Sequence, residues 1–179
     1  MTPTRTEAPA ELGPIPSPFV VLVDSREQLP FPFDNIRADA NQQYRRVHVL
    51  QERRGLKSGD YSIDGFEDRI AIERKSHEDL FNTLGRERER FERELERLNE
   101  MDFAAIVCEG SWRQIAYCPP ERSKFSCKCA MRSIFAFSIR FPRVSWWPMG
   151  CRAMAEATTY RLLERFWKDQ QKLAKQGAA

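Results

Sequence analysis

Residues 59–79 read GDYSIDGFEDRIAIERKSHED, and this stretch decides the fold of the chain around it. Asp64-Gly65 is a strong signal for a tight turn. The segments on either side, 60–63 and 69–75, are predicted to be strands. The sequence therefore indicates a β-hairpin, and Ser76, directly after the second strand, is a candidate N-cap for a following helix.

The hairpin can bring two acids and a lysine together. Residues two apart on a strand point to the same side, so Glu73 and Lys75 share a face while Arg74 points to the other. A hairpin joining the two strands can place Asp60 beside Glu73, although a register slip of one residue would separate the two acids.

Two adjacent carboxylates repel each other unless a cation neutralises them. Oxygen ligands favour Mg²⁺ or Mn²⁺, and such an ion activates a bound water and polarises a phosphoryl group. Lys75 can then orient the water or stabilise developing charge. The pattern favours metal-dependent phosphodiester hydrolysis. The alternative is that Glu73 and Lys75 form an ordinary solvent-facing pair and that Asp60 is a turn residue.

The chain of 179 residues is long enough for one domain with a substantial core and too short to expect two. The net charge of +3 by itself indicates no particular partner. No apolar run is long enough to span a bilayer and no signal peptide is recognisable, so we expect neither a membrane protein nor an exported one. The proline-rich residues 1–18 are predicted to be a flexible leader, and residues 176–179 a disordered tail.

Between these ends, over residues 19–175, strand and helix patterns alternate, which predicts an α/β domain with a central mixed β-sheet flanked by helices. Strands are expected at 19–23, 46–51, 60–63, 69–75, 103–108 and 144–147. Apolar residues at helical spacing over 80–98 indicate two helices or one broken near Gly85. Further helices are expected around Met131, Ile134, Phe135 and Ile139, and over 152–172, where Thr159, Leu162, Leu163 and Phe166 form the apolar stripe.

The five cysteines are odd in number in a chain without an export signal, so we expect reduced thiols. Cys118, Cys127 and Cys129 do not have the spacing of a zinc ribbon or finger.

Several basic and aromatic side chains are candidates for nucleic-acid contacts. Arg86, Arg88, Arg90 and Arg93 can meet phosphates or form a solvated face. Trp146 and Trp147 can stack on unpaired bases, but at least one is expected in the core. His77 is expected to face solvent.

One family shares this arrangement of motifs. Gly59-Asp60, then Glu73-Arg74-Lys75, then Asp79 matches the Gly-Asp-xn-Glu-Arg-Lys-x3-Asp pattern of the XPF-type structure-specific endonucleases. Residues 23–27, Val-Asp-Ser-Arg-Glu, resemble the family's Val-Asp-x-Arg-Glu motif. The resemblance covers about residues 19–168. It implies a restriction-endonuclease-like fold and a Mg²⁺- or Mn²⁺-dependent enzyme that cuts branched, flap or single-strand/double-strand junction DNA.

The resemblance also implies roles for individual residues. Asp60 and Glu73 would be metal ligands, either Glu27 or Asp24 would complete the metal shell, and Lys75 would be the catalytic lysine. Arg26 and Arg74 would be further active-site residues. Asp79 would be either a site residue or, with Ser76, part of a capping box.

Most relatives carry C-terminal helix-hairpin-helix units, for which this chain leaves no room, so it resembles short bacterial or viral members. We therefore expect a cytoplasmic protein of prokaryotic or viral origin that acts on DNA, with a possible homodimer. A catalytically silent module that binds DNA or scaffolds a partner nuclease is the alternative function. It is disfavoured because Asp60, Glu73 and Lys75 are all retained.

Overall fold

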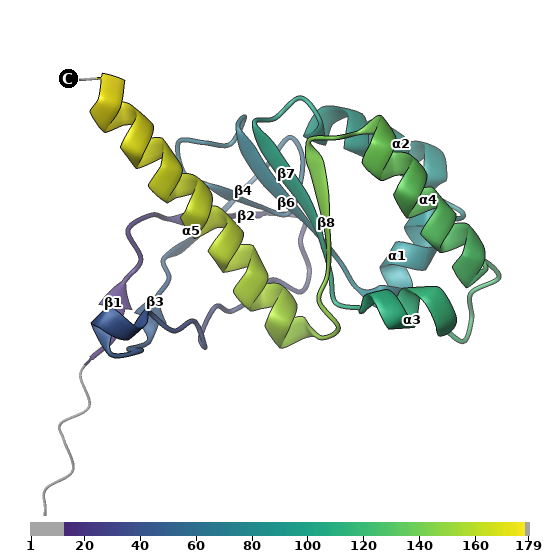
Figure 1. Cartoon of the computed structure of the whole chain (residues 1–179), viewed down its shortest axis with the longest axis horizontal. Coiled ribbons are helices and arrows are strands. Elements are labelled where there is room, and N and C mark those ends of the chain that lie inside the picture. The colour runs from purple at the N-terminus through teal and green to yellow at the C-terminus, as the bar shows by residue number, and fades with distance from the viewer. Residues whose placement is uncertain (1–12, 178–179) are drawn as a thin grey trace, which may run out of the picture.

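A six-stranded mixed β-sheet lies at the centre of the structure, a computed structural model that describes residues 13–177 (Figure 1). The strand order is β4-β2-β5-β6-β7-β8. The central strands β2, β5 and β6 are antiparallel neighbours, whereas β4, β7 and β8 join the sheet in parallel. The strands are β2 (Val21–Asp24), β4 (Gln51–Arg54), β5 (Tyr61–Ile63), β6 (Ile70–Lys75), β7 (Phe103–Cys108) and β8 (Val144–Pro148). The predicted α/β fold with a central mixed sheet is confirmed.

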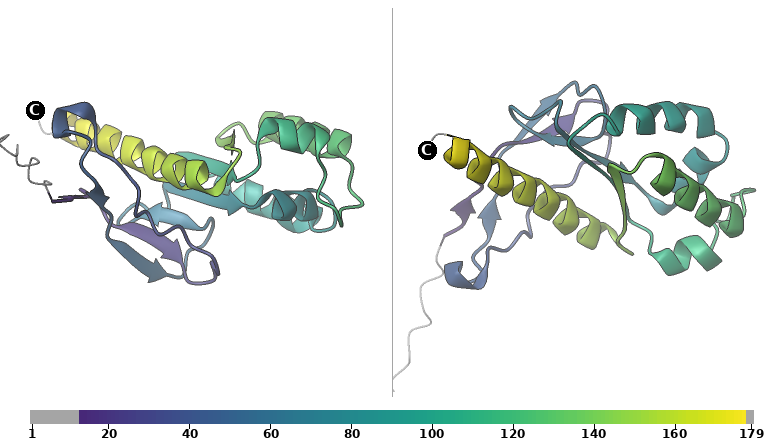
Figure 2. Two further views of the ribbon diagram at one scale, coloured as in Figure 1. Left: turned by 90° about the horizontal axis from the view of Figure 1, so that it is seen from below. Right: turned by 45° about the horizontal axis from the view of Figure 1, so that its top comes forward.

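Helices cover both faces of this sheet (Figures 1 and 2). The long helix α5 packs on one face, over a core that includes Tyr61, Ile72 and Val107. Helices α1, α2 and α4 pack on the other, over a core that includes Ala71 and Ile106. The helices are α1 (His77–Leu84), α2 (Arg88–Leu98), α3 (Trp112–Tyr117), α4 (Cys127–Arg140) and α5 (Arg152–Gly177). In the described part of the chain, no helix is both long and apolar enough to cross a membrane.

The predicted strand at 46–51 is wrong as a single element. Its first half, β3 (Val47–His48), pairs with β1 (Ile15–Pro16) in a separate two-stranded sheet, and η1 (Ala40–Gln42) precedes it. The chain then crosses to β4 at the edge of the main sheet. β1 therefore lies before residue 19, the predicted start of the domain. Helix α5 continues to Gly177, beyond the predicted end at residue 175. Residues 1–12 of the predicted leader and residues 178–179 of the predicted tail lie outside the described residues.

The hairpin between β5 and β6 has the register that the sequence analysis required. Tyr61 pairs with Ile72, and the Asp60 N–H donates to the Ile72 carbonyl at 2.8 Å. Gly59 has φ +75°, and a Cβ at this position would lie 2.9 Å from the Ala71 Cβ. Glycine is therefore required where the chain turns into β5.

The two helices after the hairpin are separate, with Gly85 as the C-cap of α1. The helix predicted around residues 131–139 also exists, as α4. Two of the apolar residues that indicated it, Phe135 and Ile139, are exposed, and α4 buries Ala130, Ser133, Ile134 and Phe137. The buried Ser133 accepts a hydrogen bond from Arg88 of α2.

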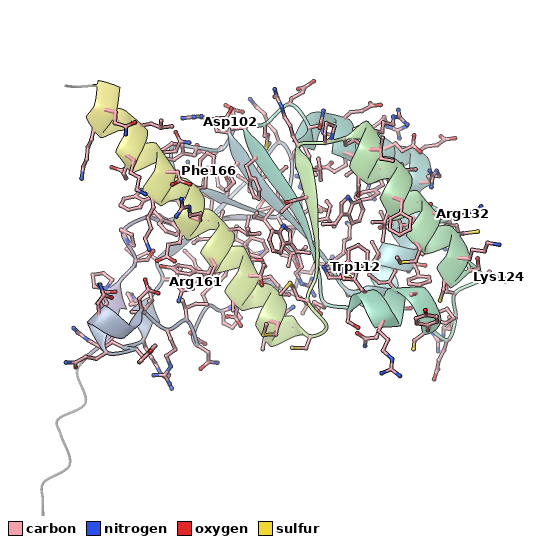
Figure 3. All side chains as sticks on the ribbon, in the orientation of Figure 1. Asp102, Trp112, Lys124, Arg132, Arg161 and Phe166 are labelled. Atoms are coloured by element: carbon pink, nitrogen blue, oxygen red, sulfur yellow. The ribbon has the colours of Figure 1, made fainter. Side chains whose placement is uncertain are left out.

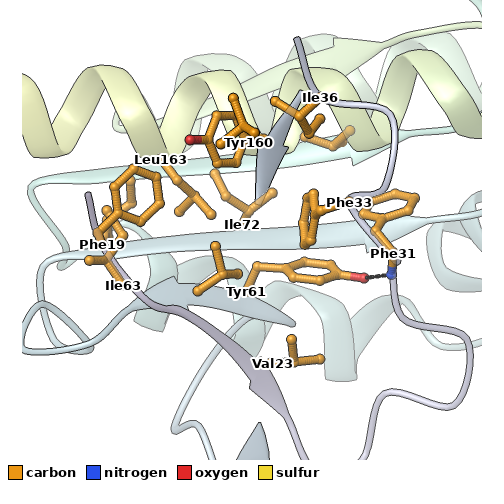
Figure 4. Close-up of a cluster of buried hydrophobic side chains, with 14 of the residues drawn as sticks. Phe19, Val23, Phe31, Phe33, Ile36, Tyr61, Ile63, Ile72, Tyr160 and Leu163 are labelled. Atoms are coloured by element: carbon orange, nitrogen blue, oxygen red, sulfur yellow. Dashed lines mark hydrogen bonds between the residues drawn. The ribbon is translucent and has the colours of Figure 1, made fainter. Parts of the chain in front are cut away.

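Helix α5 holds the hairpin and the loop after β2 together. Phe166 of α5 packs edge-on against Phe66 of the hairpin loop, with ring centroids 5.7 Å apart, and Figure 3 shows its place on the helix. Nearer the sheet centre, the Tyr61 ring stacks on Phe31 at 5.3 Å, and the Tyr61 hydroxyl accepts the Phe31 N–H at 2.8 Å (Figure 4).

Replacing Tyr61 with phenylalanine leaves the buried Phe31 N–H without its acceptor. We expect Tyr61→Phe to lower the free energy of unfolding by about 1–2 kcal/mol in urea titrations. The matched control is Tyr44→Phe, because Tyr44 is 62% exposed. An equal loss in both variants would contradict the assigned hydrogen bond.

Candidate active site

A cavity of about 690 Å³ opens between the ends of β2, β5 and β6 and the helices α1 and α2. Its wall is mostly polar and combines carboxylates with cationic side chains. All seven residues predicted for the site line it: Asp24, Arg26, Glu27, Asp60, Glu73, Arg74 and Lys75. Segments that are distant in the sequence therefore meet at one place.

Three neighbouring strands bring three carboxylates to one face of the sheet. The backbone bonds of β2 with β5 and of β5 with β6 place Asp24 beside Asp60 and Asp60 beside Glu73. Side chains directly opposite each other in antiparallel strands lie on the same face. The three acids consequently form a row across the sheet.

Asp24, at one end of this row, is fully engaged within the protein. Its Oδ1 accepts the Arg26 N–H at 2.7 Å and the Arg26 Nε at 2.9 Å, and its Oδ2 accepts Arg26 Nη2 and the Leu56 N–H. Burial alone would raise the pKa of Asp24, but these hydrogen bonds outweigh it and the pKa is lowered. Asp24 is therefore ionised, and its hydrogen bonds hold the loop that follows β2 in place.

Asp60 and Glu73 are less completely engaged. Asp60 Oδ2 accepts the Arg74 N–H at 2.8 Å, and Glu73 Oε1 accepts Lys75 Nζ at 2.6 Å. Within residues 13–177, the other oxygen of each carboxylate has no hydrogen-bond donor. Burial, together with the charge of Glu73, raises the pKa of Asp60 to about 8. Without a cation, this pair of acids is electrostatically unfavourable.

Lys75 supplies one positive charge beside the pair. Its Nζ also lies 5.6 Å from the centre of the Phe91 ring, which covers it from α2. Burial acts to lower the pKa of Lys75, but the neighbouring Glu73 and Asp60 carboxylates outweigh it and the pKa is raised. Lys75 is therefore protonated at neutral pH.

Arg74 contributes to the site through its backbone. Its guanidinium lies on the opposite face of the sheet, where Nη2 is 2.7 Å from Glu109 Oε1 and Nη1 is 3.5 Å from Glu27 Oε1. Arg152 of α5 also donates to Glu109, at 2.8 Å. The Arg74 N–H donates to Asp60, so this network on the opposite face of the sheet helps to fix the position of the Asp60 carboxylate. Glu109 and Arg152 were not predicted, since nothing in the sequence marks either as a partner of Arg74.

The carboxylate of Glu27 turns away from the acid pair. Its Oε1 accepts the Leu29 N–H at 2.6 Å and faces Arg74. Glu94 of α2 was not predicted, yet it lines the cavity and its Oε1 accepts the Gly59 N–H at 3.2 Å. Glu94 was not predicted because Glu and Arg recur along α2, so the sequence does not distinguish one acid of this helix from the others.

The two proposed roles of Asp79 are both compatible with the geometry. Its N–H donates to Ser76 Oγ at 3.1 Å, and Ser76 Oγ donates to Asp79 Oδ2 at 2.8 Å, so it belongs to the cap of α1. It also lines the cavity. The expectation that His77 faces solvent is wrong, because its ring packs edge-on against Phe81 and its Nε2 is buried. Burial lowers the pKa of His77.

The tryptophans and cysteines lie outside the cavity. Trp146 packs against Phe91 in the core, as expected for at least one of the pair, whereas Trp147 is exposed. All five cysteines are free thiols.

The acid pair fits a small divalent cation. Mg²⁺ uses one or two protein carboxylates and keeps several waters or substrate oxygens. Asp60 and Glu73 supply two such carboxylates with free oxygens. Burial together with the charge of Glu73 raises the pKa of Asp60, and a cation beside the pair would oppose this shift. Among the described residues, no three His, Cys, Asp or Glu side chains already form a metal-binding group.

The sequence of residues 23–145 matches the family model described as the ERCC4 domain. The chain belongs to this family. The resemblance to XPF-type nuclease domains predicted from the hairpin motif is thereby confirmed, and membership supports a DNA endonuclease domain. A comparison with curated proteins found no match.

Two solved structures share the fold of this ERCC4 domain. XPF from Aeropyrum pernix has a TM-score of 0.52 and 21% identity over 82% of this chain and 60% of that chain. XPF from Aeropyrum pernix in complex with DNA has a TM-score of 0.57 and 22% identity over 85% of this chain and 66% of that chain. The domain therefore spans less than two thirds of the length of either structure.

The raised pKa of Asp60 has a measurable consequence for stability. Its carboxyl is protonated in the native state up to a pH of about 8 but ionises near pH 4 when unfolded. The metal-free protein therefore loses stability as the pH rises from 4 to 8. We expect Asp60→Asn to raise the unfolding free energy in EDTA by at least about 1 kcal/mol at pH 8 and little at pH 4.

Urea titrations at both pH values measure this difference. Asp68→Asn is the control, because Asp68 is an exposed residue paired only with Lys57. Mg²⁺ should stabilise the wild type and have a smaller effect on Asp60→Asn, since a ligand that binds the native state stabilises it. A destabilised Asp60→Asn protein at pH 8 would show that the acid pair carries no electrostatic strain.

Proposed function

We propose that this ERCC4 domain is a Mg²⁺- or Mn²⁺-dependent DNA endonuclease that hydrolyses phosphodiester bonds by direct attack of water. The observation that carries the proposal is the pairing of Asp60 with Glu73 across the hairpin, with Lys75 Nζ 2.6 Å from Glu73. Family membership gives the reaction class, and the cavity gives room for a phosphodiester.

In this mechanism Asp60 and Glu73 would hold the cation, which would supply an activated water and polarisation of the phosphoryl group. The protonated Lys75 cannot accept a proton from water, so it donates hydrogen bonds to the water or to a phosphate oxygen that gains charge. The Arg74 N–H holds the Asp60 carboxylate. Asp24 holds the end of β2 through its hydrogen bonds with Arg26 and Leu56. No covalent intermediate with the protein is required.

Branched, flap or junction DNA is the proposed substrate class, by analogy with the XPF-type endonucleases. A homodimer and a cytoplasmic location in a prokaryotic or virus-infected cell stay predictions. The alternative of a silent DNA-binding module is retained as an outcome of the cleavage test, because retained acids favour activity without establishing it.

Cleavage tests the assignment of the acid pair. Flap, fork, splayed and duplex DNA are incubated with the protein in Mg²⁺, Mn²⁺ or EDTA. We expect cutting of at least one branched form only with a divalent ion. Asp60→Asn and Glu73→Gln should lower the rate by about a hundredfold or more, as loss of an essential electrostatic group does.

The control for this experiment is Glu78→Gln, which removes an exposed acid outside the cavity. Undiminished cleavage in either site variant would refute the metal-site assignment. Tight binding of DNA without any cleavage by the wild type would establish the silent module instead.

Exposed arginines at the cavity rim are proposed to hold the substrate backbone. Arg86 and Arg90, at the junction of α1 and α2, both line the cavity and are exposed. Arg88 lies between them in sequence, but it is tied to Ser133 and covers the Phe137 ring at 4.6 Å. The predicted set of four arginines therefore divides into two rim residues, Arg86 and Arg90, the structural residue Arg88, and Arg93, which is exposed outside the cavity wall.

Charge removal at the rim should weaken DNA binding in a salt-dependent way. Each lost phosphate contact reduces the slope of log K against log salt by about 0.7–0.9. We expect Arg86→Gln and Arg90→Gln each to show this reduction in fluorescence anisotropy titrations. Arg93→Gln, an equal charge change at an exposed position of α2 outside the cavity wall, is the control. Equal slopes for all three variants would contradict a rim-specific role.

A further inference from the structure

Leu29 is an apolar side chain exposed at the wall of a polar cavity. It is 65% exposed, whereas the other large hydrophobic residue of the cavity wall, Phe91, is buried, and most of the wall consists of charged side chains. A single exposed leucine on a protein surface is common and needs no explanation. What distinguishes Leu29 is that the loop carrying it is held in place at nearly every residue.

The backbone on both sides of Leu29 is fixed by hydrogen bonds. Its own N–H donates to Glu27 Oε1 at 2.6 Å, and its carbonyl accepts Arg152 Nη2 at 2.7 Å. The next carbonyl, of Pro30, accepts the same guanidinium group at 2.9 Å. The two Leu29 bonds come from opposite sides, one from the loop itself and one from α5.

The loop is also anchored one residue further on. Phe31 is fully buried, and its N–H donates to the Tyr61 hydroxyl (Figure 4). Two guanidinium groups also approach the Phe31 ring, with Arg152 at 4.8 Å and Arg74 at 5.7 Å from its centre. Pro30 and Pro32 on either side restrict the backbone further. The position of Leu29 is thereby coupled to β5 and β6, the strands that carry Asp60 and Glu73.

An apolar side chain on a fixed backbone, at the wall of a cavity proposed to hold a phosphodiester, has a specific use. The bases flanking a phosphate held at the acid pair are each joined to that phosphate through one sugar, so the cavity wall is within their reach. Leucine is one of the residues that proteins insert between base steps, where it replaces base stacking with side-chain contact. A side chain whose loop is already ordered loses little conformational entropy on insertion.

We propose that Leu29 is a wedge that inserts at the paired/unpaired boundary of the DNA substrate and sets which phosphate reaches Asp60 and Glu73. The proposal rests on the proposed function, because it requires DNA in the cavity. It also deepens that function, because it gives a physical basis for selecting a junction over continuous duplex. Unstacking costs less where one base is already unpaired, so a wedge favours such sites.

The test measures base unstacking without cleavage. Wild type, Leu29→Ala and Leu50→Ala are mixed in EDTA with a fork that carries 2-aminopurine at its paired/unpaired boundary. Leu50→Ala is the matched control, since Leu50 is 50% exposed and outside the cavity wall. Thermal melting should be the same for all three proteins, because both leucines are exposed.

We expect wild type and Leu50→Ala to raise the 2-aminopurine fluorescence on binding, and Leu29→Ala to lose most of that rise. Fork affinity should fall by about tenfold in Leu29→Ala, the loss that corresponds to a truncated, partly buried leucine. Affinity for single-stranded DNA should be unchanged.

The opposite outcomes separate the two proposals. An equal fluorescence rise in Leu29→Ala and wild type, or no rise in the wild type despite tight binding, would overturn the wedge. If the wild type nevertheless cuts the fork in Mg²⁺, the proposed nuclease function is supported and only the wedge is rejected. If no DNA form binds at all, the nuclease function and the wedge fail together.

Discussion

The pairing register of β5 with β6 is the constraint on which the site depends. Because Tyr61 lies opposite Ile72, Asp60 lies opposite Glu73. The Arg74 N–H then donates a hydrogen bond to Asp60 Oδ2. A slip of one residue would move every side chain of β6 to the other face, separating the acids and burying charge in an apolar core. The apolar residues of the hairpin therefore hold the register that brings the two carboxylates together.

Alternation along β6 gives one strand two functions. Glu73 and Lys75 face the cavity, whereas Arg74 between them points to the α5 side, where the Glu109 carboxylate accepts hydrogen bonds from both Arg74 and Arg152. The network behind the sheet is almost entirely paired, while the acid pair in front has free oxygens. This contrast separates residues that position the site from residues that can contact a substrate.

Local sequence was enough to predict the hairpin and the shared face of Glu73 and Lys75, because strand periodicity and a strong turn signal indicate both. The approach of Asp60 to Glu73 depended on a pairing register that local sequence left open, and the family motif favoured it. Local sequence was not enough for the partners of Arg74 or for Glu94, which depend on how distant segments pack. The strand predicted at 46–51 failed for a related reason. Its local pattern is extended, but tertiary pairing divides it between β3 and β4 in different sheets.

The electrostatic strain at Asp60 connects stability with function. A carboxyl whose pKa is raised to about 8 by burial and by Glu73 makes the metal-free fold less stable than a neutral isostere would. The same repulsion is relieved when a cation binds, so it contributes to affinity for that cation. When Asp60 is ionised, Lys75 compensates only part of the charge, because one amine faces two carboxylates. The surrounding braces, Asp24 with Arg26 and Arg74 with Glu109, are fully paired and hold the strained acids in place while the cavity beside them stays open to a substrate.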